Sequence, residues 1–276
     1  MSEKVNIKAY FERIGFAGSI APSLATLEQL AALQPAAIPF ENLDPIIGLP
    51  VKLDQRSLEH KLLHNRRGGF CFELNTLFMR VLADLDYSVK PYTARVLWGY
   101  PPDAERPLSH MVLGVEINNA PYLVDVGFGS FTLTAPLKMR PDIEQQTPNE
   151  TFRLLTDGEG FRLEVNLDEE WKPVYQFDPV ERSPEELADL SVEMAADHHD
   201  NNLLGASRAE KSVRYNLLRN RLTIHRAGEE RERVVLEDVD GLKQVLATTF
   251  EINLPPSDVL DPALARVIEA APVEAD

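Results

Sequence analysis

The sequence predicts an α+β fold in which helices come first, an antiparallel sheet or small barrel follows, and helices mix with strands at the end. Apolar residues recur with the helical period up to about residue 85. From Tyr87 the period is two for about a hundred residues, which is typical of strands. In the last part, one hairpin pattern precedes two helical patterns.

The first third predicts a small helical bundle. Its expected elements are a helical stripe over residues 7–14, a helix opened by a capping-box pattern at Thr26, a Pro-broken connection over 38–43, a short helix over 57–64 and a helix that begins at Cys71.

Short, evenly spaced strands with turn residues between them predict the antiparallel sheet or barrel. The expected strands cover residues 92–98, 110–117, 122–128, 152–155, 161–165 and 171–177. Ser183 and Pro184 then give a helix start. The polar stretch 197–211 has no clear period and favours a loop or linker. A hairpin over 221–235 and helices over 242–250 and 262–270 follow.

Composition excludes several functional classes. The net charge of −16 would repel nucleic acid and anionic membranes. A phosphate-bearing substrate would therefore need a local basic patch, for which Arg66, Arg67 and Arg95 are the candidates. No apolar run approaches the ~20 residues that span a bilayer.

A single cysteine excludes an intrachain disulfide, and the start of the chain has no apolar signal region. We therefore expect a reducing cytoplasm. His60 and His64 stand four apart without an acidic or cysteine ligand beside them, so no metal site is expected.

Cys71 is the main candidate for a catalytic residue. Gly68 and Gly69 lead directly into a run with helical period, which places Cys71 at a helix N-terminus. There the unpaired backbone N–H groups and the helix dipole stabilise a thiolate relative to a thiol. A lone cysteine is more often a small buried hydrophobe, so its partners decide between the two interpretations.

Two strands offer those partners. His110 and Asp125 project away from the apolar faces of their strands. If Asn118 and Asn119 form a two-residue turn, paired positions sum to 237, and Asp125 lies diagonal to His110 on one side of the sheet. Diagonal Cβ atoms are about 7–8 Å apart, within reach of a hydrogen bond. Shifting the turn by one residue would separate the two by roughly 13 Å at 3.3 Å per residue. We therefore expect the Asn118-Asn119 register and a Cys71, His110 and Asp125 set that suits cysteine acyl transfer.

Several distinct motifs occur along the chain: RGGFCFELN at 67–75, IPFENL at 38–43, YLVDVGFG at 122–129, YFERIG at 10–15 and RLTIH at 221–225, with His110 between them. Together they make the chain resemble the arylamine N-acetyltransferases. The resemblance implies a helical N-terminal bundle over 1–86, an antiparallel β-barrel over 87–182, a helical and loop segment over 183–211 and a C-terminal α/β lid over 212–276.

The resemblance also implies a ping-pong reaction. Cys71 would take an acetyl group from acetyl-CoA and pass it to an arylamine, arylhydrazine or N-hydroxyarylamine, with His110 and Asp125 completing the triad. It implies that Phe40 and Phe128 line the aromatic pocket. Residues near the acyl donor would be Gly127, Gly129, Ser130 and Thr132. On residue pattern alone, the turn at 127–130 could let an anionic group approach backbone N–H donors, but the pattern favours a barrel-corner turn.

Residues 195–211 depart from the pattern of many bacterial members of the family. Because this region borders the cleft in the family, the resemblance does not determine the acceptor or the cofactor contacts. Three alternatives stay open: an amide synthase that closes a macrolactam from a carrier-bound acyl chain, a papain- or transglutaminase-like acyl transferase, and a non-catalytic binding protein on this scaffold. We expect a monomer or weak homodimer.

Overall fold

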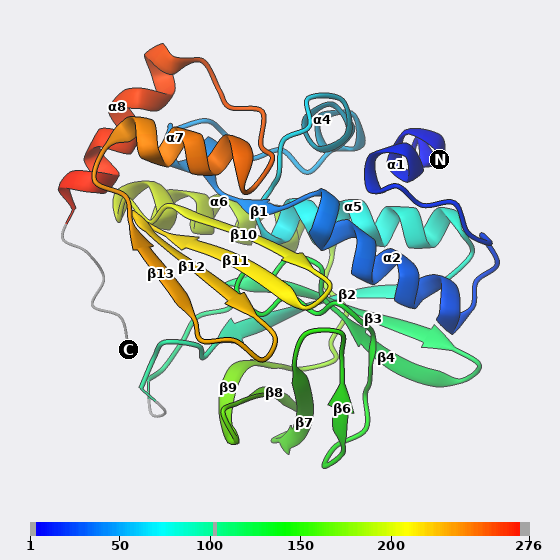
Figure 1. Cartoon of the computed structure of the whole chain (residues 1–276). Coiled ribbons are helices and arrows are strands. Elements are labelled where there is room, and N and C mark those ends of the chain that lie inside the picture. The colour runs from blue at the N-terminus through cyan, green and yellow to red at the C-terminus, as the bar shows by residue number, and fades with distance from the viewer. Residues whose placement is uncertain (1–3, 102–103, 271–276) are drawn as a thin grey trace.

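The N-terminal part is helical, as the sequence predicts. The short helix over Leu43–Ile46 is not among the expected elements, and the helices expected from Thr26 and residue 57 begin at Leu24 and Gln55. The computed structural model describes residues 4–101 and 104–270. The helices are α1 (Ile7–Ile14), α2 (Leu24–Ala37), α3 (Leu43–Ile46), α4 (Gln55–Leu58), the π-helix η1 (Glu59–His64) and α5 (Cys71–Asp84) (Figure 1).

The capping box expected at Thr26 is wrong. Helix α2 begins at Leu24, because the extended Ser23 is its N-cap and Ser23 Oγ accepts from Thr26 N at 3.2 Å. Thr26 therefore lies inside the first turn, where it is buried. Ser23 and Thr26 stand three residues apart, and either residue type can be an N-cap. The extended backbone of Ser23 decides between them.

Eight antiparallel strands form a nearly closed barrel in the order β5-β4-β3-β2-β9-β8-β7-β6. They are β2 (Ser88–Val96), β3 (His110–Ile117), β4 (Ala120–Val124), β5 (Leu137–Lys138), β6 (Glu144–Gln146), β7 (Thr151–Asp157), β8 (Gly160–Leu167) and β9 (Glu170–Phe177). The Gln145 side chain bonds the backbone N and O of Lys138 at 2.7 and 3.0 Å, and so links the two end strands.

A second antiparallel sheet has the order β1-β10-β11-β12-β13. Its strands are β1 (Phe40–Glu41), β10 (Gly205–Glu210), β11 (Val213–Leu218), β12 (Arg221–Arg226) and β13 (Glu232–Val235), and the last helices are α7 (Val239–Thr248) and α8 (Ser257–Glu269). We call β10 to β13 with these two helices the lid. Strand β1 joins the lid sheet although it comes from the N-terminal part.

The loop expected over residues 197–211 is wrong. Helix α6 (Pro184–Asp200) continues to Asp200, and β10 occupies 205–210. Small and polar residues gave this strand no visible apolar alternation. Only Ala206 and Ala209 pack inward as apolar residues, and pairing with β1 and β11 determines the strand.

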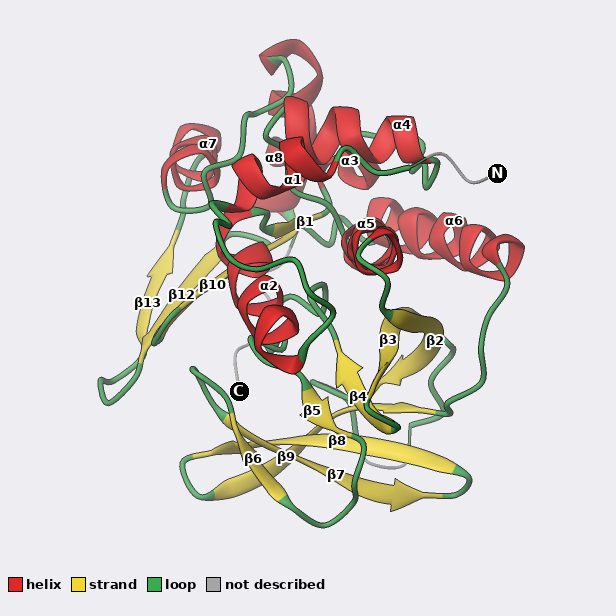
Figure 2. Cartoon of the chain, turned by 90° about the vertical axis from the view of Figure 1, so that its right-hand side faces the viewer, coloured by secondary structure: helices red, strands yellow, loops and turns green. Residues whose placement is uncertain are grey.

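Three apolar clusters hold these parts together. One lies between the N-terminal helices, α6 and one face of β3 and β4, the second lies between α3 and the lid, and the third fills the barrel. Helix α5 lies on the barrel at β2 and β3 with α6 beside it (Figure 2). Among the described residues, no helix is both long and apolar enough to cross a membrane.

Candidate active site

The two glycines before the cysteine allow one backbone to pass close to another. Gly69 N donates to the Pro39 carbonyl at 3.2 Å, and Glu41 N donates to the Gly69 carbonyl at 2.9 Å. A Cβ on Gly68 would collide with the same Pro39 oxygen. The close approach is therefore between the segments 38–43 and 67–75, which explains why both sequence motifs belong to one site.

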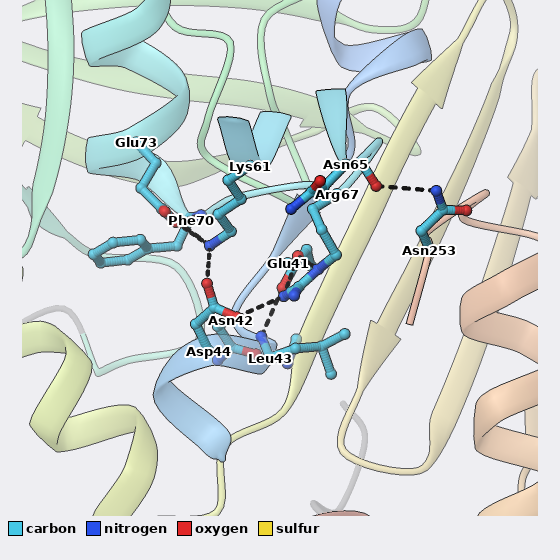
Figure 3. A network of polar contacts seen from close by, with 11 residues as sticks. Glu41, Asn42, Leu43, Asp44, Lys61, Asn65, Arg67, Phe70, Glu73 and Asn253 are labelled. Atoms are coloured by element: carbon cyan, nitrogen blue, oxygen red, sulfur yellow. Dashed lines mark hydrogen bonds and ion pairs between the residues drawn. The ribbon is translucent and has the colours of Figure 1, made fainter. Parts of the chain in front are cut away.

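A buried polar network holds the start of α5 (Figure 3). Glu73 Oε2 accepts from Phe70 N at 3.1 Å, and Lys61 Nζ contacts Glu73 Oε1 at 2.8 Å. The same Nζ lies 2.7 Å from Asp44 Oδ2, and Arg67 bridges Asp44 and Glu41 at 2.9 and 2.8 Å. Because Glu73 caps Phe70, the next residue, Cys71, stands at the first helical position.

Burial and neighbouring charges act in opposite directions in this network. Burial raises the pKa of Glu73, and the Lys61 ammonium offsets part of that rise. Burial also raises the pKa of Asp44, but Lys61 and Arg67 outweigh it, so that the pKa of Asp44 is lowered. The pKa values of both carboxyl groups thus depend on the Lys61 ammonium.

The β3–β4 hairpin has the register that the sequence predicts. Leu113 pairs with Val124 and Ile117 with Ala120, both of which sum to 237. Asn118 and Asn119 take left-handed φ values of 52° and 60°, as a two-residue type I′ turn requires. Strand β4 ends at Val124, so the strand expected over 122–128 is too long.

This register brings His110 and Asp125 together. His110 Nε2 lies 2.7 Å from Asp125 Oδ2, and both side chains are buried. The other carboxylate oxygen, Oδ1, accepts from Asn75 Nδ2 and from Gly127 N, each at 3.0 Å. With three donors around it, the carboxylate fixes the orientation of the imidazole ring.

Cys71 completes the group from the side of α5. Its Sγ lies 4.0 Å from the Ser109 carbonyl oxygen, and its side chain is near enough to the His110 ring to help raise the pKa of that ring. Because Nε2 faces Asp125, Nδ1 is the nitrogen left for the sulfur. The structure therefore brings together the three residues that the sequence singled out.

The electrostatics of the group favour a charged imidazole. Burial by itself lowers the pKa of His110, but the Asp125 carboxylate and the Cys71 side chain outweigh it and raise that pKa to about 10. An imidazolium at this position can stabilise negative charge on the neighbouring sulfur.

Aromatic rings surround the imidazole. The ring centroid of Phe128 lies 5.1 Å from that of His110 at 84°, and the Tyr175 centroid lies at 5.4 Å. Phe40 is half-buried in β1, and its ring carbons lie 3.6 Å from where a Cβ on Gly129 would stand. Of the predicted pocket residues, Phe128 thus lies in the turn after Asp125 with its ring against His110, and Phe40 approaches the same turn at Gly129.

The turn after Asp125 has few free backbone donors at its glycines. Gly127 N is bonded to Asp125, and Gly129 N donates to Thr132 Oγ1 at 2.9 Å. Neither of these two N–H groups is therefore free to receive an anion. A Cβ on Gly127 would stand 3.0 Å from Cys71 Cα, so this glycine serves the approach of α5. Ser130 is half-buried and Thr132 is buried.

The basic patch considered from the sequence does not form around Arg67, whose half-buried side chain is held in ion pairs with Glu41 and Asp44. Arg66 and Arg95 are exposed. In the described part of the chain, no group of three or more His, Cys, Asp or Glu residues is placed to hold a metal ion.

Comparison with known sequences adds to this geometry. The profile of a family described as N-acetyltransferase matches residues 23–259. An arylamine N-acetyltransferase of Mycobacterium tuberculosis is 37% identical over 256 residues, which are 91% of this chain and 90% of that protein. The chain belongs to the arylamine N-acetyltransferase family. It is thus an acetyltransferase enzyme, and the expected family is confirmed.

Other members of the arylamine N-acetyltransferase family agree in sequence and fold. A Salmonella typhimurium arylamine N-acetyltransferase / N-hydroxyarylamine O-acetyltransferase is 34% identical over 262 residues, 90% of this chain and 89% of that protein. The solved Mycobacterium marinum arylamine N-acetyltransferase in complex with CoA has a TM-score of 0.90 and 36% identity, and the match covers 95% of this chain and 99% of that one.

In this member of the arylamine N-acetyltransferase family, two site residues escaped sequence reasoning. Asn75 stands four residues after Cys71, on the same helix face, so a polar side chain among apolar neighbours was a usable signal. Its Oδ1 also accepts from Val126 N at 3.1 Å. Tyr175 lies in β9; burial, followed by the Asp125 charge, raises the pKa of its hydroxyl well above the usual value. Nothing in its sequence context separated it from other strand aromatics.

Proposed function

We propose that this enzyme transfers an acetyl group from acetyl-CoA to the nitrogen of an arylamine, arylhydrazine or N-hydroxyarylamine by a ping-pong mechanism through Cys71. The hydrogen bond of 2.7 Å between His110 and Asp125, beside a cysteine at a helix N-terminus, is the observation that carries the proposal. The CoA complex of the Mycobacterium marinum relative supports the choice of donor.

In the first half-reaction the Cys71 thiolate attacks the thioester carbonyl of acetyl-CoA. The backbone N–H of Cys71, at the first helical position, has no intrahelical acceptor and can stabilise the oxyanion. Collapse of the tetrahedral intermediate breaks the bond to the CoA sulfur, which takes the proton from the His110 imidazolium and leaves as a thiol. The result is an acetyl-cysteine beside a neutral imidazole.

In the second half-reaction the acceptor nitrogen attacks the acetyl carbonyl. An aromatic amine is weakly basic and neutral near pH 7, so its lone pair is available. His110 removes the proton from nitrogen, and Cys71 leaves as the thiolate of the starting state. Phe40 and Phe128 would line the acceptor pocket, and Ser130 and Thr132 would lie near the donor.

The cell compartment follows from the same chemistry. A single nucleophilic cysteine must stay reduced between turnovers, which a reducing cytoplasm provides. We therefore infer a cytoplasmic location.

The test of the proposal is a measurement of CoA release without an acceptor. Mixing the reduced enzyme with acetyl-CoA should release a burst of one CoA for each active site, and Cys71→Ser should release none. CoA release that begins only when an arylamine is added would indicate direct transfer and contradict the ping-pong mechanism. No release from an enzyme whose Cys71 still reacts with iodoacetamide would instead favour an amide synthase that takes its acyl group from a carrier.

A further inference from the structure

A buried ion pair joins the lid to the barrel close to the candidate active site. Arg214 lies in β11, and Glu150 stands immediately before β7. The pair is bidentate, with Nε to Oε1 and Nη2 to Oε2 both at 2.6 Å. The side chains are only 2% and 4% exposed. Because these two oxygens and nitrogens face each other in parallel, the pair fixes orientation as well as distance.

The same guanidinium also holds the turn after Asp125. Arg214 Nη2 donates to the Thr132 carbonyl at 2.8 Å. Thr132 in turn closes the turn on itself, because Thr132 N donates to the Gly129 carbonyl at 3.1 Å while Thr132 Oγ1 accepts from Gly129 N. A side chain of the lid therefore sets the position of residues 129–132.

The turn is tied to the triad at its other end. Leu133 N donates to the Asp125 carbonyl at 2.9 Å, and Gly127 N donates to the Asp125 carboxylate. Hydrogen bonds thus run without interruption from Arg214 through Thr132 to the aspartate that orients His110.

The backbone of Glu150 is held by hydrogen bonds to Thr147. Thr147 Oγ1 donates to the Glu150 carbonyl at 2.8 Å and accepts from Glu150 N at 3.2 Å. Next to it, Asn149 accepts from Thr134 Oγ1 at 2.9 Å and donates to the Glu210 carbonyl of β10 at 2.8 Å. Barrel and lid are therefore joined twice, through Glu210 and Arg214 on the two sides of the turn between β10 and β11.

We propose that Arg214 and Glu150 are positioning residues that hold the turn 129–132 in place for the acyl donor. A buried ion pair is weak evidence of stabilisation, because desolvation can exceed the attraction between the charges. The bidentate geometry of the Arg214–Glu150 pair therefore indicates a role in positioning rather than in stability. The inference rests on the proposed function, in which this turn lies near acetyl-CoA.

Arg214→Lys is the variant that separates positioning from charge. Lysine keeps a cation for Glu150 but lacks the planar fork that bonds the carboxylate and Thr132 at once. We expect the KM for acetyl-CoA to rise about tenfold, the effect of losing one charge-assisted hydrogen bond. The KM for the arylamine and the rate at which iodoacetamide alkylates Cys71 should change by less than about twofold, since the triad contacts are unaltered.

Arg153→Lys is the matched control. Arg153 also makes a charged contact through Nε and Nη2, to Glu164 at 2.9 and 2.7 Å, but within the barrel strands β7 and β8. This variant should keep the wild-type KM for acetyl-CoA. If Arg214→Lys folds poorly, Arg214→Met combined with Glu150→Leu removes both buried charges and should raise the same KM.

Each outcome decides something. An unchanged KM for acetyl-CoA in Arg214→Lys, or an equal rise in Arg153→Lys, would overturn the positioning role. A fall in the alkylation rate of Arg214→Lys that matches its loss of activity would also overturn it, because the effect would then be general disruption of the site. Failure of the proposed function would show separately, as absence of the acetyl-CoA burst in the wild-type enzyme.

Discussion

At the scale of single residues, Asp125 rather than Cys71 gathers most of the contacts. It receives His110 on one oxygen and Asn75 and Gly127 on the other. Asn75 comes from the cysteine helix, so one hydrogen bond ties the helix that carries the nucleophile to the carboxylate that orients the base. Local order in the triad therefore depends on a residue that is not itself a triad member.

The raised pKa of His110 predicts how stability depends on pH. His110 has an ordinary pKa of 6.5 when unfolded and about 10 when folded. Its protonated form therefore stabilises the folded state below the unfolded value, and that contribution is lost as pH rises through the folded value. Cys71→Ser keeps the Asp125 carboxylate, which contributes more than Cys71 to the raised pKa of His110. We therefore expect Cys71→Ser to lose stability to urea relative to Cys71→Ser/His110→Gln as the pH rises above about 6.5. A difference in the free energy of unfolding that stays constant over this range would contradict the assigned pairing.

Sequence reasoning reached the triad because its geometry depends on a short-range element. The turn at Asn118 and Asn119 fixes which residues of two adjacent strands face each other, and asparagine tolerates the left-handed conformation that the turn needs. Tyr175 could not be found in this way, because its strand reaches the site by pairing with β2, which lies far away in the sequence.

At the scale of elements, the start of α5 packs directly on the chain after Asp125. Gly127 makes this possible, since a Cβ there would stand 2.9 Å from Asn75 Nδ2 and 3.0 Å from Cys71 Cα. The helix start and the strand end thus determine each other's position.

Gly127→Ala should therefore damage activity more than stability. We expect kcat/KM to fall by about tenfold or more, because the added methyl group displaces Cys71 from His110. Steady-state kinetics beside a thermal melt give the comparison. Gly228→Ala is the control with the opposite pattern: a Cβ there meets nothing within 4 Å, but the left-handed φ of 80° disfavours alanine, so this variant should melt earlier and keep wild-type kinetics. Wild-type kinetics in Gly127→Ala would show that α5 has room to move.

Strands β1 and β10 could not be predicted from the sequence. Polar residues and alanines form β10, and only two residues form β1. Their pairing joins segments more than 160 residues apart, as in Phe40 with Ser207. Local periodicity contains no signal for such contacts, whereas the hairpin of β12 and β13 was visible from its turn.

At the scale of the whole molecule, the site lies where all three parts meet. The cysteine comes from the helical part, His110 and Asp125 come from the barrel, and Phe40 stands in a strand of the lid sheet (Figure 1). The charged network beneath α5 joins three elements of the helical part, since Lys61 of η1 contacts both Asp44 of α3 and Glu73 of α5. Removing one charge from it should therefore destabilise the part that carries Cys71.

Lys61→Met should lower the free energy of unfolding by about 3–5 kcal/mol, because it leaves the buried Glu73 carboxylate without its cation. Urea denaturation measures this directly. The control is Lys8→Met, whose ion pair with Glu12 is exposed and should contribute less than about 1 kcal/mol. Equal effects of the two substitutions would show that the network contributes no more than a surface ion pair.

The most direct test of the whole account is mass spectrometry of the enzyme after incubation with acetyl-CoA and no acceptor. The account predicts one acetyl group on the peptide that contains Cys71, its removal on addition of an arylamine, and no acetyl group on Cys71→Ser. An active, reduced enzyme that remains unacetylated, or one acetylated at another residue that then donates to the amine, would contradict it.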